Sequence, residues 1–300
     1  MSKLASLSLI GLALIALGAY AAERGGPKVY ISVDMEGVAG VVTSDQLLPG
    51  GFEYERFRRF MTDETLAAVR AAQNAGAAEI VVSDSHGNGE NLLIDAFPNN
   101  VRIVRSWPRH GLMAAGLDST FQAALLIGYH ASASSSTGVR AHTFSSASYA
   151  RVALNGQDVS EGAWVAAQAG ALGVPVVFAS GDDAMTRELK QKLGDIETVE
   201  TKHSLGFHSA LTLTPQESVA RIEAGVATAL ARLGKIKPYV LSTPIRLEVT
   251  FKNYMPAEVL AYLRSVERVN AHSILFVGRD MDEVTDFMVV VGTYKPDLSP

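Results

Sequence analysis

The sequence contains no cysteine among its 300 residues. This absence excludes disulfide bonds, thiolate metal ligands, a cysteine nucleophile and the lipid-bearing cysteine of a lipoprotein. Any metal ion would therefore have to be bound by histidine and carboxylate side chains. The sequence also lacks a basic cluster, and its formal net charge is −5. A mildly acidic chain of this kind is not expected to bind nucleic acid.

Several common catalytic motifs are missing too. The chain has no G-x-S-x-G serine elbow, no G-x-x-x-x-G-K-[ST] phosphate loop and no H-E-x-x-H zinc helix. Ser85 precedes His86, but adjacent residues cannot form a nucleophile and base pair with normal geometry. There is no internal repeat, and the serine-rich stretch 132–138 is too short to separate domains. Serine hydrolases, phosphate-loop proteins and enzymes with an H-E-x-x-H zinc helix are therefore poor matches for the chain.

The one long apolar run lies at the N-terminus. Lys3 precedes an apolar stretch over residues 4–17, and Ala19-Tyr20-Ala21 matches an A-x-A cleavage site. We expect residues 1–21 to be a secretory signal peptide, which leaves no stable membrane span after cleavage. The alternative is an uncleaved anchor, although the run is short for the roughly 20 residues that a span needs. On either interpretation the protein is exported, and we expect it in the periplasm.

The remaining chain predicts an α/β fold. It is long enough to bury a full core, with 48% hydrophobic and 19% charged residues. Strand-like runs alternate with helical patterns through at least four units, which indicates a layered sheet with flanking helices. The expected strands are 28–33, 79–82, 101–104, 123–127, 151–154 and 174–179, and the expected helices begin at Tyr54 and Asp158.

The last third of the chain is less regular. Thr214-Pro215-Gln216-Glu217 has the cap, proline and capping-box residues of a helix start. Apolar residues alternate with polar ones over 245–251, as expected for a strand with one solvated face. We expect residues 22–200 to form a metal-binding α/β domain. Residues 201–300 would form a smaller C-terminal α+β region that completes the site or an oligomer interface.

Two acidic residues follow the first expected strand. Asp34 and Glu36 are two positions apart, so in an extended backbone both carboxylates project from the same side. Two anions in this position repel unless one is protonated or a cation lies between them. The pair indicates a metal site, but two solvated acids at a strand end explain it equally well.

Two histidines occupy the matching positions after other strands. His86 and His130 each follow an apolar run directly, which places both at the sheet edge where open α/β sheets bind ligands. Neutral imidazole is a common ligand of zinc-like ions. A single histidine at a strand end is usually structural, but two of them together with Asp34 and Glu36 favour a metal site.

Two further candidates remain open on the residues alone. Glu161 lies in Asp158-Val159-Ser160-Glu161, which fits a capping box and favours a helix cap over a ligand. His142, beyond the serine-rich loop, is either an ordinary loop histidine or an acid or base that reaches the sheet edge. We interpret the remaining histidines as structural: His110, His203, His208 and His272.

Four sequence blocks in order carry a family resemblance. They are Ser32-Val33-Asp34-Met35-Glu36-Gly37, Ser83-Asp84-Ser85-His86, Gly128-Tyr129-His130-Ala131 and Phe251-Lys252-Asn253-Tyr254. Together they resemble the zinc D-aminopeptidases associated with bacterial dipeptide-transport operons. The resemblance covers nearly all of the mature chain and implies two divalent metal ions, expected to be zinc.

The resemblance also implies roles for individual residues. The metal ligands would be Asp34, Glu36, His86, His130 and Glu161, with Asp34 bridging the two ions, so that Glu161 changes from cap to ligand. The catalytic histidine of the family, described as a nucleophile, corresponds to His142. The gap between His130 and His142 is one residue longer here, which puts the path of that loop in doubt. The resemblance further implies a homo-oligomer built as a ring, with stacked pentamers forming a decamer.

The expected function is that of an exported metallo-aminopeptidase. It would hydrolyse the N-terminal residue, a D-amino acid, of short peptides with a water activated by two metal ions. His142 would transfer a proton to the departing amine rather than act as the nucleophile. The alternatives are a two-metal phosphoesterase or amidase, and a non-catalytic, metal-dependent binding protein of the periplasm.

Overall fold

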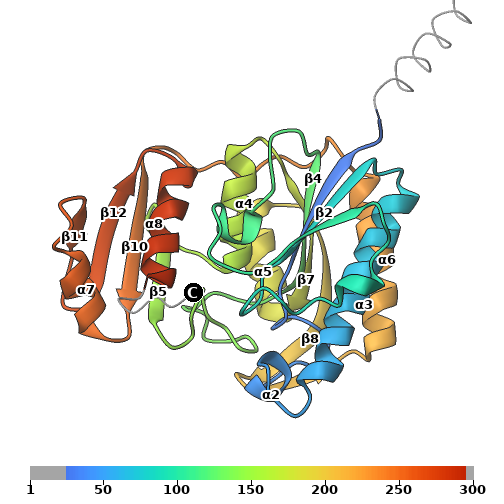
Figure 1. The fold of residues 1–300 in the computed structure, drawn as a ribbon, viewed down its shortest axis with the longest axis horizontal. Coiled ribbons are helices and arrows are strands. Elements are labelled where there is room, and N and C mark those ends of the chain that lie inside the picture. Colours follow the sequence, from blue (N-terminus) through green and yellow to red (C-terminus); the bar gives the residue numbers. More distant parts are fainter. Residues whose placement is uncertain (1–24, 295–300) are drawn as a thin grey trace, which may run out of the picture.

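The computed structural model describes residues 25–294. The expected signal peptide, residues 1–21, lies outside the described residues. No helix of the described part is long and apolar enough to cross a membrane. Two sheets lie side by side (Figure 1). The strands of the larger sheet fall within residues 28–212, and three of the five strands of the smaller sheet fall within residues 245–278.

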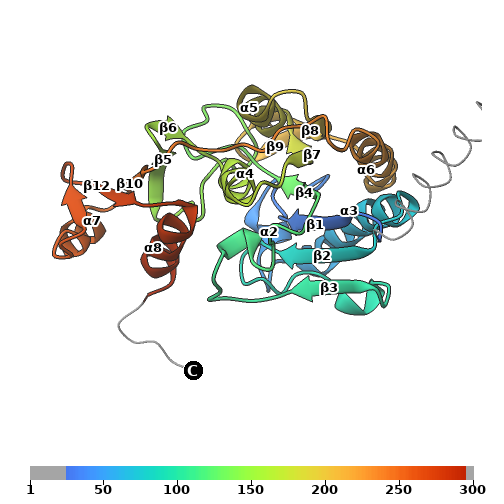
Figure 2. The same ribbon diagram turned by 90° about the horizontal axis from the view of Figure 1, so that it is seen from above.

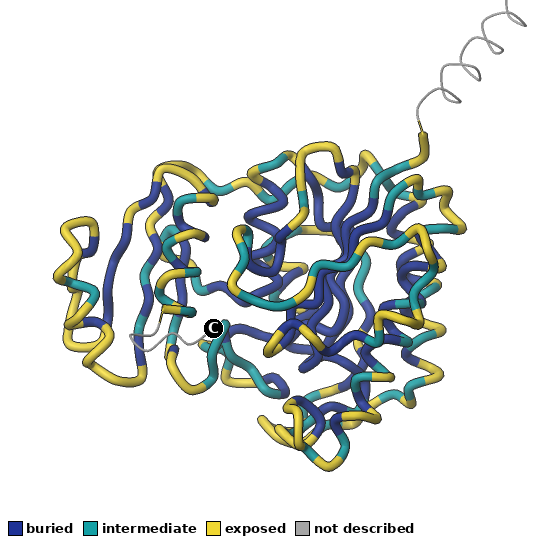
Figure 3. The backbone as a smooth tube through the Cα atoms, viewed as in Figure 1, coloured by how far each residue is buried: buried dark blue, intermediate teal, exposed yellow. Residues whose placement is uncertain are grey.

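The larger sheet has seven strands. In spatial order they are β3 (Val101–Val104), β2 (Glu79–Asp84), β1 (Lys28–Val33), β4 (Ala123–Tyr129), β7 (Val176–Asp182), β8 (Glu197–Gly206) and β9 (Ser209–Thr212). All neighbours pair in parallel except β8 and β9, which form an antiparallel hairpin. Strands β1, β2, β4 and β7 are buried almost along their full lengths (Figure 3), as is usual for parallel strands covered on both faces.

Helices cover both faces of this sheet (Figure 2). The α-helices of the structure are α2 (Ser44–Leu47), α3 (Tyr54–Asn74), α4 (Glu161–Ala171), α5 (Asp183–Leu193), α6 (Pro215–Leu230), α7 (Tyr254–Leu260) and α8 (Met281–Thr293), with short 3-10 turns at Ile94–Ala96 and Leu112–Ala114. Val29, Ile31 and Val33 of β1 pack in one cluster with α3 and α6. Tyr30 faces the other side, where α4 and α5 pack. The predicted layered α/β fold is confirmed.

The smaller sheet has five antiparallel strands. Their order is β11 (Val266–Arg268), β12 (Ser273–Gly278), β10 (Ile245–Phe251), β5 (Tyr149–Leu154) and β6 (Gln157–Asp158). The alternation predicted for 245–251 is present, since Ile245, Leu247, Val249 and Phe251 are buried. This sheet therefore joins two stretches of chain. Residue 200, where we expected a boundary, lies inside β8 of the larger sheet.

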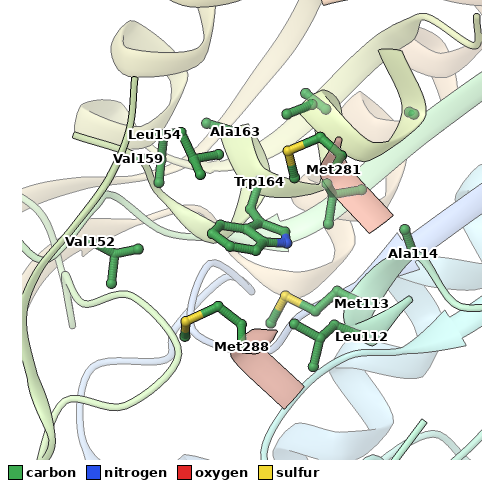
Figure 4. Packing of buried hydrophobic residues seen from close by; sticks show 14 of the residues in the cluster. Leu112, Met113, Ala114, Val152, Leu154, Val159, Ala163, Trp164, Met281 and Met288 are labelled. Atoms are coloured by element: carbon green, nitrogen blue, oxygen red, sulfur yellow. The ribbon is translucent and has the colours of Figure 1, made fainter. Parts of the chain in front are cut away.

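Trp164 of α4 packs where the two sheets meet. Its buried indole lies among methionines that include Met113, Met281 and Met288 (Figure 4). Met281 and Met288 belong to α8, which covers the smaller sheet, while Met113 belongs to the turn Leu112–Ala114 beside the larger sheet. A single hydrophobic cluster therefore continues from one sheet to the other and fixes α8 beside the edge of the larger sheet.

Candidate metal centre

Three neighbouring strands bring the predicted ligands together. Asp34 follows β1, and the strands on either side of β1 lead to His86 and His130. The Asp34 amide continues the sheet by donating to the Ile127 carbonyl of β4 at 2.8 Å. Because parallel strands end at the same edge, side chains separated by about fifty residues in sequence converge there. The predicted common edge is confirmed.

Two glycines allow the strand ends to approach closely. A Cβ on Gly37 would lie 2.0 Å from the Tyr129 carbonyl oxygen, and one on Gly128 would lie 2.3 Å from the Asp34 carbonyl oxygen. Gly128 also has φ +71°, a left-handed conformation that favours glycine. The Gly37 amide donates to the Gly128 carbonyl at 2.6 Å. The glycines therefore let the segments that carry Glu36 and His130 lie against each other.

The first group of side chains consists of Asp34, Glu36 and His86, all buried. His86 Nδ1 lies 2.9 Å from Glu36 Oε2 and 3.3 Å from Asp34 Oδ1. One nitrogen and two carboxylate oxygens thus face one point, which is a donor set that divalent cations accept.

The second group consists of His130, His142 and Glu161. His130 Nε2 lies 3.5 Å from Glu161 Oε2, and His142 Nε2 lies 3.6 Å from Glu161 Oε1 and 3.9 Å from Glu36 Oε1. The rings of His130 and His142 stack with centroids 4.1 Å apart. His142 therefore reaches the sheet edge, and its Nε2 faces carboxylates of both groups.

Asp34 is a member of the first group and also faces the second. Its Oδ1 faces His86, and its Oδ2 lies 3.2 Å from His130 Nε2. Asp34 Oδ2 and His130 Nε2 are fully buried, yet neither has a hydrogen-bond partner among the described residues. Buried polar atoms without partners are costly. A cation between these atoms would satisfy both, so the residues present fit two ions that share the Asp34 carboxylate.

The three histidines are oriented in the same way. Each ring donates one N–H to a backbone carbonyl: His86 Nε2 to Leu47 at 2.9 Å, His130 Nδ1 to Ala131 at 3.0 Å and His142 Nδ1 to Arg140 at 2.7 Å. The other nitrogen of each ring faces the carboxylates. Metal-binding histidines commonly have this second contact, which fixes the tautomer and the direction of the free nitrogen.

Burial and mutual attraction control ionisation in the site. Burial, reinforced by the negative charge of Glu36, raises the pKa of Asp34. Burial opposes ionisation of Glu36, but the neighbouring imidazoles, chiefly His86, outweigh it and hold the pKa of Glu36 well below its usual range. The carboxylates likewise outweigh burial and raise the pKa of His86 and His130 well above the usual value. The site therefore favours bound positive charge.

Known proteins resemble this chain along most of its length. The D-aminopeptidase family model matches residues 28–290. A D-aminopeptidase of Bacillus subtilis (strain 168) is 31% identical over 267 residues, which are 88% of this chain and 96% of that protein. The chain belongs to the D-aminopeptidase family. A solved structure, the zinc-dependent D-aminopeptidase DppA from Bacillus subtilis, described as a self-compartmentalizing protease, matches with a TM-score of 0.84 and 30% identity over 88% of this chain and 96% of that one.

In this family member Glu161 is not the helix cap. Ser160 caps α4 by accepting from the Ala163 amide, and Glu161 is the first helical residue. Its Oε1 accepts from the Phe144 amide at 2.5 Å, and its Oε2 faces His130. The capping interpretation was therefore wrong. The predicted helix start at Asp158 was also wrong, because Asp158 pairs with β5 and the helix begins after Ser160.

The two groups of side chains open into a cleft of about 630 Å³. Ligand-group residues line its floor, and its walls include Trp107, Arg140, Phe144, Phe251 and Met288. Phe251 and Met288 come from the smaller sheet and its helix α8, so residues beyond 200 do contribute to the cleft. The sequence did not indicate these wall residues, because their meeting depends on how the two sheets pack.

The other histidines lie outside both ligand groups. His110 Nδ1 lies 2.7 Å from Asp286 Oδ1, and His203 Nδ1 lies 3.3 Å from Asp183 Oδ2; all but Asp183 are exposed. His208 Nε2 lies 3.1 Å from Arg140 Nη1. In the described part of the chain, His272 also belongs to neither group. None of these four residues is needed to explain the centre.

Proposed function

We propose that this enzyme is a two-metal D-aminopeptidase that releases the N-terminal D-residue of short peptides. The observation that carries the proposal is the shared carboxylate of Asp34, whose two oxygens face two separate groups of ligand atoms. The first ion would be held by Asp34, Glu36 and His86, and the second by Asp34, His130 and Glu161. Zinc is the expected ion, since the related Bacillus subtilis protein is described as zinc-dependent.

The residues of the chain divide the work of hydrolysis. The ions that these residues would hold would supply a Lewis acid for the peptide carbonyl and would lower the pKa of a water molecule, so that hydroxide is available as the attacking group near neutral pH. Glu36 and Glu161 hold negative charge on either side of the centre, which favours the binding of cations between them. Phe144, Phe251 and Met288 line the cleft and offer apolar surface to a substrate side chain.

His142 is the residue that we assign to proton transfer. It lines the cleft, and its side chain is 12% exposed, whereas the side chain of His130 is 1% exposed. Its Nδ1 is occupied by the Arg140 carbonyl, so Nε2 is the atom available to carry a proton to the departing amine. The same nitrogen could instead bind the second ion, and metal content in a His142 variant distinguishes these roles.

Export and assembly are part of the proposal. The pattern of Lys3, the apolar run and the A-x-A site supports cleavage after residue 21 and a periplasmic location. Peptides rich in D-alanine, such as cell-wall fragments, are the substrates this location suggests. The description of the related protein as self-compartmentalizing supports a homo-oligomer, and we propose a decamer of stacked pentamers.

The proposed activity is tested with a matched pair of substrates. Purified protein beginning at residue 22 is incubated with D-alanyl and L-alanyl p-nitroanilide before chelation, after chelation and after zinc is restored. We expect cleavage of the D form, its loss on chelation and its recovery with zinc. Cleavage that survives complete metal removal, or a preference for the L form, would contradict the proposal. Hydrolysis of aryl phosphates alone would favour the phosphoesterase alternative.

A further inference from the structure

The backbone that follows Asp34 is irregular and buried. The segment Glu36–Val41 forms neither helix nor strand, and all of its residues except Gly40 are buried. Buried carbonyl groups outside regular elements need hydrogen-bond donors from elsewhere in the protein. Because Glu36 is a residue of the first ligand group, the donors that hold this segment also influence the centre.

Two adjacent residues of β8 supply those donors. The Nζ of Lys202 donates to the carbonyls of Glu36, Val38 and Val41, the last two at 2.9 and 2.7 Å. The Thr201 hydroxyl donates to the Gly37 carbonyl at 2.6 Å. Lys202 and Thr201 therefore contact the backbone of this segment at four carbonyls, from a strand more than 160 positions away in the sequence.

Lys202 is unusual for a lysine. It is 2% exposed, and in the described part of the chain its Nζ donates to backbone carbonyls and not to carboxylates. Burial lowers its pKa to about 8, so the ammonium group still carries its proton at neutral pH and has three N–H groups to donate. The three carbonyls accept these N–H groups, and a charged group buried in this way is retained only where it makes such contacts.

The opposite side of the segment is also held. Glu64 of α3 accepts from the Ala39 amide at 3.0 Å, and the hydroxyl of Ser218 in α6 donates to the same Glu64 oxygen at 2.7 Å. Side chains of β8 therefore bind carbonyl groups of the segment, and Glu64 of α3 binds its Ala39 amide. Rotation of the Glu36 backbone would break the contact to Lys202 and move the Glu36 carboxylate away from His86 at the same time.

We propose that Lys202, supported by Thr201, is a positioning residue that fixes Glu36 and thereby sets the affinity of the Asp34–Glu36–His86 group for its ion. The inference rests on the proposed two-metal function. The hydrogen bonds of Lys202 all go to the segment that carries Glu36, and none of them goes to His130, His142 or Glu161. Its effect should therefore fall on the first group, of which Glu36 is a member, before the second.

The test measures zinc affinity at each half separately. Lys202→Met keeps a similar side-chain length but removes all three donors. In a Glu161→Gln background the first group alone retains its full ligand set, and in a His86→Ala background the second group alone does. We expect Lys202→Met to weaken zinc binding about 10- to 100-fold in the first background, as loss of outer-shell contacts does, and to leave it unchanged in the second.

Two further variants separate positioning from general loss of stability. Thr201→Val is milder and should weaken the first group several-fold; it carries the test if Lys202→Met fails to fold. Val249→Ala removes buried methyl groups from the smaller sheet and should alter neither affinity although it lowers the melting temperature. If the Lys202 and Thr201 variants kept their zinc affinity, or lost it equally at both groups, the positioning role of Lys202 would be overturned. The proposed metal centre would not be affected by that result. Wild-type protein that binds no zinc would overturn the metal centre as well.

Discussion

The two halves of the proposed centre contain similar candidate ligands but are supported in different ways. His130 and Glu161 lie directly after a strand and at the first residue of a helix, so regular elements fix their backbones. Glu36 lies in an irregular segment whose carbonyls are bound by β8 side chains. The comparison teaches that a ligand outside regular structure needs its own buried support. Such support can come from a distant part of the chain.

The largest loss of zinc and of turnover is expected when the residue that faces both halves of the centre is removed. Asp34→Ala deletes the carboxylate whose oxygens face His86 and His130. We expect zinc content to fall at both sites and turnover of a D-alanyl substrate to fall on the order of 10⁴-fold. Elemental analysis of the dialysed protein, together with kcat, checks this. Retention of two ions would show that Asp34 is not shared.

Removing one ligand from each half should separate them. His86→Ala should release the ion of the first group and Glu161→Gln that of the second, each leaving about one ion per chain and lowering kcat on the order of 10³-fold. The pair of variants is compared by zinc stoichiometry at equal free zinc. If either variant lost both ions while the other lost none, the division into two groups would be incorrect.

His142 tests whether the second half contains a residue that acts on the substrate. Its Nε2 faces the cleft, so His142→Ala should lower kcat roughly 10²- to 10³-fold while both ions remain. His110→Ala is the matched control, because His110 pairs with Asp286 outside the site. Loss of one ion from the His142 variant would instead make this residue a ligand of the second group.

The smallest effect, on stability and not on turnover, is expected from Glu64, which supports the irregular segment through Ala39. Burial raises the pKa of Glu64 from the usual 4.5 to about 7. Because the folded state keeps the Glu64 proton that the unfolded state loses, stability falls progressively as pH rises from about 4.5 to 7, by about 3 kcal/mol in full. Glu64→Gln should gain stability over the wild type at pH 8 and little at pH 4.5, as measured by urea unfolding. An equal difference at both pH values would argue against the raised pKa.

Much of the candidate centre and of the fold could be predicted from the sequence. Asp34, His86 and His130 follow apolar runs, and parallel strands must end at one edge. Glu161 could not be distinguished from a cap, because an acidic residue at a helix start fits both roles. Nor could Lys202 be found, since Thr201-Lys202-His203-Ser204 looks like a solvated strand and its burial arises only from contact with the segment Glu36–Val41.

The smaller sheet was the least predictable part of the fold. β5 and β10 pair across about ninety residues, and the pairing of Leu154 with Leu247 has no local signal in either strand. We expected one boundary near residue 200, but the sheet takes strands from both sides of that position. Long-range antiparallel pairing is set by packing of buried faces, which periodicity alone does not reveal.

The central claim is that two ions share the carboxylate of Asp34. Anomalous diffraction from crystals of zinc-loaded protein, measured on both sides of the zinc absorption edge, locates each ion directly. We predict two peaks, one among Asp34, Glu36 and His86 and one among Asp34, His130 and Glu161. A single peak, or two peaks that both lie away from Asp34, would contradict the account.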